Sequence, residues 1–98
     1  MNKLLVLTFL SVILIRCNTE EARKLVWSDE FSNPGQPDSS RWNYDLGDGC
    51  PDVCGWGNNE LEYYTNDSKN VRVENDILII EAQKDSLGGK GFTSTRII

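Results

Sequence analysis

The sequence predicts an all-β protein, an antiparallel sandwich or barrel of short strands. Three observations support this fold class. Beyond residue 18, no window of useful length repeats its apolar residues every 3.6 positions, as an amphipathic helix would. The apolar runs are rich in Val, Ile, Thr, Tyr and Trp, which strands favour. Turn residues divide the chain into about four to six such runs at regular spacing, as in sandwiches and barrels.

The N-terminal segment 1–17 is expected to be an export signal outside that fold. Lys3 is followed by a twelve-residue apolar run, Leu4–Ile15, which is short for a membrane span and suits a signal peptide. Cys17 then resembles the acylated Cys of bacterial lipoproteins, although Arg16 stands where those signals have a small residue. We expect export, as a secreted protein or as a cell-surface or outer-membrane lipoprotein with lipidation at Cys17. A buried hydrophobic helix is the alternative.

Residues 18–24 are expected to form a polar tether, and the folded domain is expected over residues 25–98. Leu, Val and Trp at 25–27 predict an opening strand. The composition NPGQPD makes residues 33–38 a loop. Alternating side chains predict a brief strand over residues 41–44.

Residues 48–57 are rich in Gly, Pro, Asp and Cys and are expected to form a loop. Export would place Cys50 and Cys54 where disulfides persist. A bond between them would close a very small loop, so we expect it to stiffen one turn. A metal site is the alternative, but the chain has no His, and two thiols alone cannot complete a tetrahedral site.

The rest of the domain is expected to consist of strands joined by tight turns. Asn75 and Asp76 predict a hairpin, and the glycines of 88–91 predict another turn. The chain ends on apolar residues, and an apolar edge strand invites aggregation, so we expect this to be the first part of a larger protein. The expected strands are 60–65, 71–74, 77–82 and 92–98.

Charge and composition argue against several functions. Lys3 and Arg16 precede residue 18, so the remainder has eight basic and fifteen acidic residues, a formal net charge of −7. Nucleic-acid surfaces need clustered Lys and Arg, so we expect no nucleic-acid partner. Without His, the Ser-His and Cys-His mechanisms and most catalytic zinc sites are excluded within these residues.

The candidate site is the stretch 56–65, WGNNELEYYT, which combines amides, carboxylates and aromatics. Amides and carboxylates beside Trp56 suit a sugar, whose hydroxyls need donors and acceptors and whose ring stacks on aromatics. An exposed polar strand face over a core face is the alternative. Alternation along a strand would place Asn58, Glu60 and Glu62 on one face, and Asn59, Leu61 and Tyr63 on the other.

Two carboxylate arrangements stay open at this point. Glu60 and Glu62 would lie about 6.6–6.8 Å apart along a strand. Depending on how the side chains are oriented, the two carboxyl groups could have the spacing of a retaining or of an inverting glycosidase pair. They could equally be a charged stripe on the surface. Asp29 and Glu30 are adjacent, so on a strand their side chains would point to opposite faces. Glu30 could instead cap or bind a cation together with loop carbonyls, as in calcium sites.

Five pieces of the chain, in order, resemble the N-terminal portion of glycoside hydrolase family 16, and most closely its laminarinase-like endo-β-1,3-glucanases. The likeness runs from about residue 24 to residue 98, and its most specific piece is 55–65. The pieces are 26–31 (VWSDEF), 38–44 (DSSRWNY), 55–65 (GWGNNELEYYT), 70–82 (NVRVENDILIIEA) and 92–97 (FTSTRI).

The resemblance implies a β-jelly roll, concanavalin A-like, with a long cleft across its concave sheet. It also implies retaining hydrolysis, in which one glutamate attacks the anomeric carbon and another protonates the leaving oxygen and then activates water. The family motif Glu-x-Asp-x-Glu, or its form with one extra residue, does not occur in this chain. Glu60 and Glu62 match a different strand of the family, so we expect the catalytic glutamates outside this chain.

By the same resemblance, Asn58 and Arg96 match positions that hydrogen-bond sugar hydroxyls near the donor subsites. Glu60 and Trp56 are further candidates, and Trp56 either stacks on a sugar or packs under the loop. The Cys50–Cys54 loop occurs beside the cleft in one branch of the family. Trp27 and Trp42 are assigned to core packing.

The expected protein is therefore the N-terminal part of an exported, monomeric endo-β-glucanase that binds laminarin-like β-1,3-glucan. Such enzymes require no cofactor, and the resemblance leaves room for a structural calcium ion far from the cleft. A non-catalytic carbohydrate-binding surface lipoprotein is one alternative. Another is a structural β-domain in which Asn58 and Arg96 are ordinary surface residues. Family members also cut mixed-linkage glucan, agarose, carrageenan and porphyran.

Overall fold

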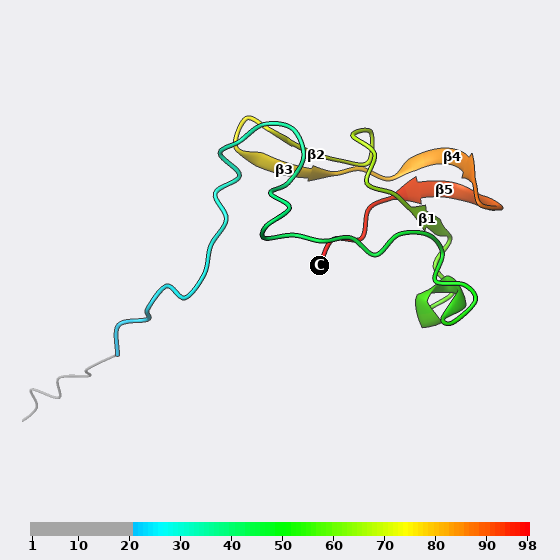
Figure 1. The fold of residues 1–98 in the computed structure, drawn as a ribbon, viewed down its shortest axis with the longest axis horizontal. Helices are drawn as coiled ribbons and strands as arrows, with labels where there is room; N and C mark the ends of the chain where they lie inside the picture. The colour runs from blue at the N-terminus through cyan, green and yellow to red at the C-terminus, as the bar shows by residue number, and fades with distance from the viewer. Residues whose placement is uncertain (1–20) are drawn as a thin grey trace, which may run out of the picture.

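The structure is a computed structural model that describes residues 21–98, so the expected signal segment and Cys17 lie outside the described residues. The described part confirms the all-β prediction, since its elements are five strands and one short 3-10 helix (Figure 1). Nothing within residues 21–98 forms a helix of the length and apolarity that crossing a membrane requires. In chain order the elements are η1 (Cys54–Gly57), β1 (Glu62–Tyr64), β2 (Val71–Glu74), β3 (Ile77–Ile80), β4 (Gln83–Leu87) and β5 (Lys90–Ser94).

β2 and β3 form the predicted antiparallel hairpin, with Val71 paired to Ile80 and Glu74 to Ile77. The two-residue turn has φ of 51° at Asn75 and 61° at Asp76. Both values are left-handed, which is the backbone that the favoured hairpin turn needs and that Asn and Asp tolerate. The hairpin prediction is confirmed, although β3 ends at Ile80 and not at residue 82.

The second sheet has the strand order β1-β5-β4. β1 runs parallel to β5, with Tyr63 opposite Thr93, while β4 and β5 form an antiparallel hairpin. Gly88 and Gly89 make its turn with φ of 56° and 77°. β4 was not expected from the sequence, because its residues, QKDSL, do not alternate and begin with four polar or charged side chains in a row.

Three sequence expectations fail in the first half of the chain. Residues 25–27 are not a strand, because none of the described residues pairs with their backbone. Trp27 is 57% exposed, so its assignment to the core is wrong. Trp42 is half-buried and packs edge-on against Trp27, with ring centroids 5.4 Å apart. The strand expected at 41–44 shrinks to a single bridge between Tyr44 and Ile97.

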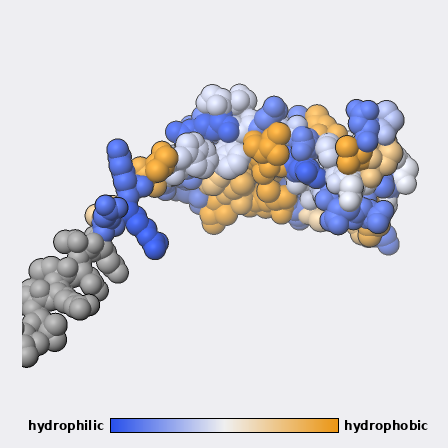
Figure 2. Space-filling view, turned by 90° about the horizontal axis from the view of Figure 1, so that it is seen from below, coloured by the Kyte–Doolittle hydropathy of each residue, from blue (hydrophilic) through white to orange (hydrophobic). Residues whose placement is uncertain are grey.

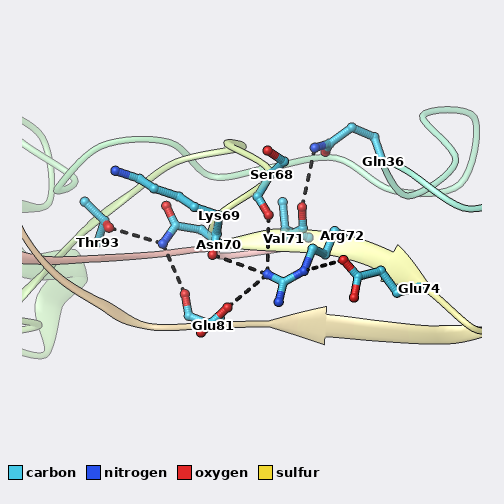
Figure 3. Close-up of polar contacts among 9 residues, drawn as sticks. All are labelled: Gln36, Ser68, Lys69, Asn70, Val71, Arg72, Glu74, Glu81 and Thr93. Carbon is cyan, nitrogen blue, oxygen red and sulfur yellow. Dashed lines mark hydrogen bonds and ion pairs between the residues drawn. The ribbon is translucent and has the colours of Figure 1, made fainter.

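A buried asparagine joins the two sheets (Figure 3). Asn70 is fully buried, and its Nδ2 donates to the Glu81 carbonyl and to Thr93 Oγ1, each at 3.1 Å. Its Oδ1 accepts from Thr65 Oγ1 at 2.5 Å. The side-chain amide therefore has partners at both ends, as a buried amide must. These bonds tie the start of β2 to β5 and to the segment after β1.

The apolar core is small. Among the described residues, Val71 and Val73 are the buried hydrophobic side chains, at 0% and 2% exposure. Figure 2 shows hydrophobic surface gathered on the half of the body that carries the β2–β3 hairpin. The exposed large hydrophobic residues are Leu25, Val26, Trp27, Leu46, Val53, Leu61, Ile77, Ile80, Leu87, Phe92 and Ile98.

Candidate functional site

The loop before β1 is shaped by local bonds that place Trp56. A disulfide joins Cys50 and Cys54. The Gly55 N–H donates to the Asp48 carbonyl at 2.8 Å, and the Trp56 N–H donates to the Val53 carbonyl at 2.8 Å. Gly49 is required, because a Cβ there would lie 2.0 Å from the Val53 oxygen. The Trp56 indole N–H then donates to the Gly47 carbonyl at 3.3 Å, which fixes the ring against the loop.

Arg96 lies over Trp56 and is held there by two carboxylates. Its guanidinium carbon is 4.7 Å from the centre of the Trp56 ring. Its Nε lies 3.0 Å from Asp45 Oδ2, and its Nη1 lies 3.6 Å from Glu60 Oε2. The structure thus brings together three of the residues expected at the site, Trp56, Glu60 and Arg96. Arg96 remains 38% exposed, so part of its donor fork faces solvent.

Tyr64 completes the arrangement from β1. Its hydroxyl donates to Glu60 Oε2 at 2.7 Å, and its ring centroid is 6.3 Å from that of Trp56. Burial and the hydrogen bond to Glu60 raise the pKa of Tyr64 to about 12, so it stays a neutral donor at ordinary pH. Tyr64 therefore holds the Glu60 carboxylate in the position that Arg96 uses.

Asn58 lies between Trp56 and Glu60 in the chain and is exposed. Its backbone N–H donates to the Gly55 carbonyl at 3.0 Å. Its side-chain amide has no hydrogen bond to the described residues, so both its donors and its acceptor are open to a ligand. Within residues 21–98, no hydrogen bond joins the side chains of Asn58 and Arg96.

The expected alternation of faces along 58–63 is wrong. Asn58 and Asn59 lie in a turn, with φ of 51° at Asn59, and β1 begins only at Glu62. Leu61 is 64% exposed and is not a core residue. Glu60 is engaged by Tyr64 and Arg96, which favours a structural carboxylate over one half of a catalytic pair.

Sequence reasoning missed two residues of this site. Tyr64 could have been found from the sequence. It follows Glu60 by four positions in the stretch 56–65, and residues an even number of positions apart on a strand share a face. Asp45 had none, since it lies in the loop before Gly47 and reaches Arg96 only in the fold. We call Asp45, Trp56, Glu60, Tyr64 and Arg96 the Arg96 cluster.

A shallow pocket lies apart from the Arg96 cluster, lined by residues 28–33, Asp38, Arg41 and Val73. Asp29 is already occupied there, because its carboxylate accepts from the Phe31 N–H at 2.9 Å and from the Trp42 indole N–H at 2.7 Å. Among residues 21–98, no group of three or more His, Cys, Asp or Glu side chains gathers as a metal site would.

Comparison with solved structures now tests the resemblance. The laminarinase of Rhodothermus marinus superposes with a TM-score of 0.67 at 48% identity, over 76% of this chain and 28% of the other. A second solved structure, a non-specific endo-β-1,3(4)-glucanase from family GH16, superposes with a TM-score of 0.65 at 44% identity, over 76% of this chain and 29% of its own. These matches confirm the resemblance to glycoside hydrolase family 16.

Sequence comparison supports the same resemblance. A beta-glucanase of Rhodothermus marinus is 41% identical over 92% of this chain and 33% of its own length. The clotting factor G alpha subunit of Tachypleus tridentatus is 40% identical over 94% of this chain and 12% of its own. The chain therefore spans a third or less of the length of these relatives. No protein-family model matches it.

Proposed function

We propose that this chain forms one wall of the glucan-binding cleft of an exported endo-β-1,3-glucanase of family 16. The observation that carries the proposal is the Arg96 cluster, in which a partly exposed guanidinium is held over Trp56 by Asp45 and Glu60. The names of the relatives, laminarinase and beta-glucanase, favour a laminarin-like substrate.

The residues would divide the work of holding a sugar. Arg96 covers one face of Trp56, and the indole N–H is used by Gly47, which favours packing under the loop over sugar stacking for Trp56. Arg96 would then donate its outward N–H groups to sugar hydroxyls. Asn58 would add a donor pair and an acceptor from the same loop.

Bond cleavage would use groups outside this chain. In the proposed retaining double displacement, one carboxylate attacks the anomeric carbon while a carboxylic acid protonates the departing oxygen, and water then releases the sugar from the enzyme. The motif for that pair does not occur in these 98 residues. The contribution of this chain is to position the glucan so that the bond to be cut lies between those two carboxyl groups.

The test compares Arg96→Lys with Arg41→Lys in the complete gene product. Lysine keeps the charge but loses the planar fork that spans Asp45 and Glu60, so we expect affinity for laminarin to fall about tenfold. Arg41 lies over Trp27 and bonds to the Ser28 carbonyl, so its substitution is the matched control. Calorimetric titration with laminarin oligosaccharides measures the affinity of each variant. Equal affinity for the two variants would contradict the proposed cleft wall.

A non-catalytic glucan-binding module is the second candidate. It is favoured by the match to a clotting factor subunit, a protein whose name states no hydrolase activity. Incubation of the complete gene product with laminarin, lichenan and agarose separates the two. Release of laminarin oligosaccharides supports the enzyme, whereas binding without any release supports the module.

We further propose export through residues 1–17, with lipidation at Cys17 as the only membrane attachment, and a monomer that needs no cofactor beyond an optional calcium ion. The support is the sequence pattern alone. Labelling with radioactive palmitate tests the anchor. Label that is lost in Cys17→Ala and kept in Cys54→Ala is the expected result, and an unlabelled parent protein would contradict it.

A further inference from the structure

The sheet β1-β5-β4 has one buried face and one open face, and Phe92 lies on the open one. β5 is the middle strand, between β1 and β4 (Figure 1). Thr93 and Thr95 are buried, at 0% and 7% exposure, whereas Phe92 is 42% exposed. Because successive side chains on a strand point to opposite faces, Phe92 shares the open face with Ser94 and Arg96. We call this face the Arg96 face.

Charged side chains of opposite sign flank Phe92 on the Arg96 face. Its backbone partners are Glu62 on β1 and Lys84 on β4, and residues paired across strands point to the same face. Neighbouring strands lie about 4.7–4.9 Å apart, so both side chains lie beside that of Phe92. Within residues 21–98, neither the Glu62 carboxylate nor the Lys84 ammonium takes part in an ion pair. The acceptor and the donor are therefore open to a ligand that lies on the ring.

An aromatic ring between an acceptor and a donor suits a sugar better than a polypeptide. The C–H face of a pyranose stacks on an aromatic ring, and the hydroxyls at its rim need the hydrogen-bonding groups that a carboxylate and an ammonium supply. The core of a protein–protein interface, by contrast, is depleted of charged side chains. Because the two flanking charges cancel, the site favours a neutral sugar over a sulfated one.

The strand that carries Phe92 is joined to the Arg96 cluster on both sides of the ring. Lys90, two residues before Phe92, donates from Nζ to the Glu60 carbonyl at 3.3 Å. Arg96, four residues after Phe92, places Nη1 3.6 Å from Glu60 Oε2. Four residues of extended chain separate the Cα atoms of Phe92 and Arg96 by about 13 Å. A single sugar ring cannot contact both residues, but a chain of several sugars can.

We propose that Phe92, flanked by Glu62 and Lys84, is a second sugar-binding subsite of this wall, on which a neutral pyranose of the same glucan chain stacks. The inference rests on the proposed glucan cleft and adds to it a dependence on chain length. An oligosaccharide too short to reach from Arg96 to Phe92 binds at the Arg96 cluster alone, and a longer one gains the stacking contact.

The experiment measures the affinity of the complete gene product for thio-linked laminarin oligosaccharides of two to six sugars, which a glycosidase does not cleave. Calorimetric titration gives a dissociation constant at each length. We expect the affinity of the parent protein to rise with length. Phe92→Ala should bind the shortest of these ligands as the parent does, which also shows that the Arg96 cluster is folded. It should bind the six-sugar ligand about fivefold more weakly, because the stacking contact is lost.

Two other substitutions at the same position separate stacking from packing. Phe92→Tyr keeps the ring and should bind the six-sugar ligand within about twofold of the parent. Phe92→Leu keeps an apolar side chain on the strand but has no flat face, so it should lose affinity as Phe92→Ala does. Ile80→Ala is the matched control, because Ile80 is 46% exposed and lies on a strand of the other sheet. It should follow the parent at every length.

The subsite is overturned if Phe92→Ala matches the parent at every length, as it would if the rest of the complete protein covered the ring. A loss of equal size at every length would also overturn it, because that result indicates a structural role. So would Phe92→Leu binding the six-sugar ligand as tightly as Phe92→Tyr.

The same titrations test the proposed glucan cleft separately. If Arg96→Lys weakens binding at every length while Phe92→Ala changes none, the cleft wall stands and the subsite at Phe92 is wrong. If the parent protein binds none of the oligosaccharides, the cleft itself is wrong, and the subsite with it.

Discussion

At the scale of single residues, one amide carries much of the link between the two sheets. Asn70 uses both amide protons and its oxygen on partners from three segments. Its own backbone carbonyl accepts from the Glu81 N–H at 2.8 Å. Because Asn70 is fully buried, a partner that is lost leaves a polar atom shielded from bulk solvent.

Asn70→Ala should therefore lower the free energy of unfolding by about 2–3 kcal/mol, since Thr65 and Thr93 lose a buried partner. Urea titration followed by tryptophan fluorescence measures the change. Asn66→Ala is the control, because Asn66 is exposed and its side chain makes no hydrogen bond to the described residues. A shift no larger than that of the control would show that the Asn70 network contributes little.

Asp29 makes stability depend on pH. The Phe31 N–H and the Trp42 indole N–H hold the pKa of Asp29 below its usual 3.8. A carboxyl group whose pKa is lower in the folded than in the unfolded state stabilises the fold when the pH is above its unfolded-state pKa. This stabilisation is lost as the pH falls through its folded-state pKa. The pKa of Asp38 is lowered by hydrogen bonds from Ser40, and that of Asp85 by a hydrogen bond from Lys69.

We expect the urea midpoint to fall as the pH is lowered from about 5 to about 2, and to fall less in Asp29→Asn than in the parent. Asp52→Asn, an exposed residue without a side-chain hydrogen bond in the described structure, should follow the parent curve. If the urea midpoints of all three proteins depend on pH in the same way, Asp29 does not contribute to the pH dependence of stability.

The candidate site was predicted in part at this scale. Trp56, Glu60 and Arg96 were named from the family resemblance, and the structure gathers them around one guanidinium. Asp45 could not be predicted, because its approach to Arg96 depends on strand bridges between segments about 50 residues apart. Asn58 was named as well, but it lies in a turn in place of the expected strand, and its side chain makes no hydrogen bond to Arg96 in the described structure.

At the scale of elements, turn chemistry was the most reliable signal. Asn75–Asp76 and Gly88–Gly89 were predicted as turns because few residues accept left-handed φ, and both are turns. β4 was missed because its run of polar residues shows no alternation of polar and apolar side chains, which is the pattern that predicts a strand. The opening strand at 25–27 failed for a different reason, since strand propensity needs a neighbouring strand and the described chain supplies none there.

Gly88 and Gly89 allow a matched test of the β4–β5 turn. Both have left-handed φ, but a Cβ on Gly88 would lie 2.2 Å from the Tyr63 ring, whereas one on Gly89 would meet nothing within 4 Å. Gly89→Ala should cost about 1 kcal/mol from backbone strain alone. Gly88→Ala should cost about 2–4 kcal/mol, because overpacking adds to the strain. Equal urea midpoints for the two variants would contradict the close approach of Tyr63.

At the scale of the whole molecule, the small core sets the stability. Domains of this size bury a smaller fraction of their surface than large domains do, and their stability is marginal. Here two valines are the buried hydrophobic residues of the described part. We expect a free energy of unfolding of about 4 kcal/mol or less at neutral pH, the low end for a domain. A urea titration that gives more than about 6 kcal/mol would mean that the exposed apolar residues are covered in solution.

The parallel pairing of β1 with β5 has a consequence for biosynthesis. β1 cannot find its partner until the ribosome has made the β2–β3 hairpin, β4 and β5, because Tyr64 pairs with Ser94. Arg96 emerges later still, forty residues after the Trp56 that it covers. Local hairpins can form while the chain is being translated, but this long-range pairing must wait. The Arg96 cluster is therefore assembled after both hairpins, and a nascent chain arrested just before Arg96 would display its hairpins without it.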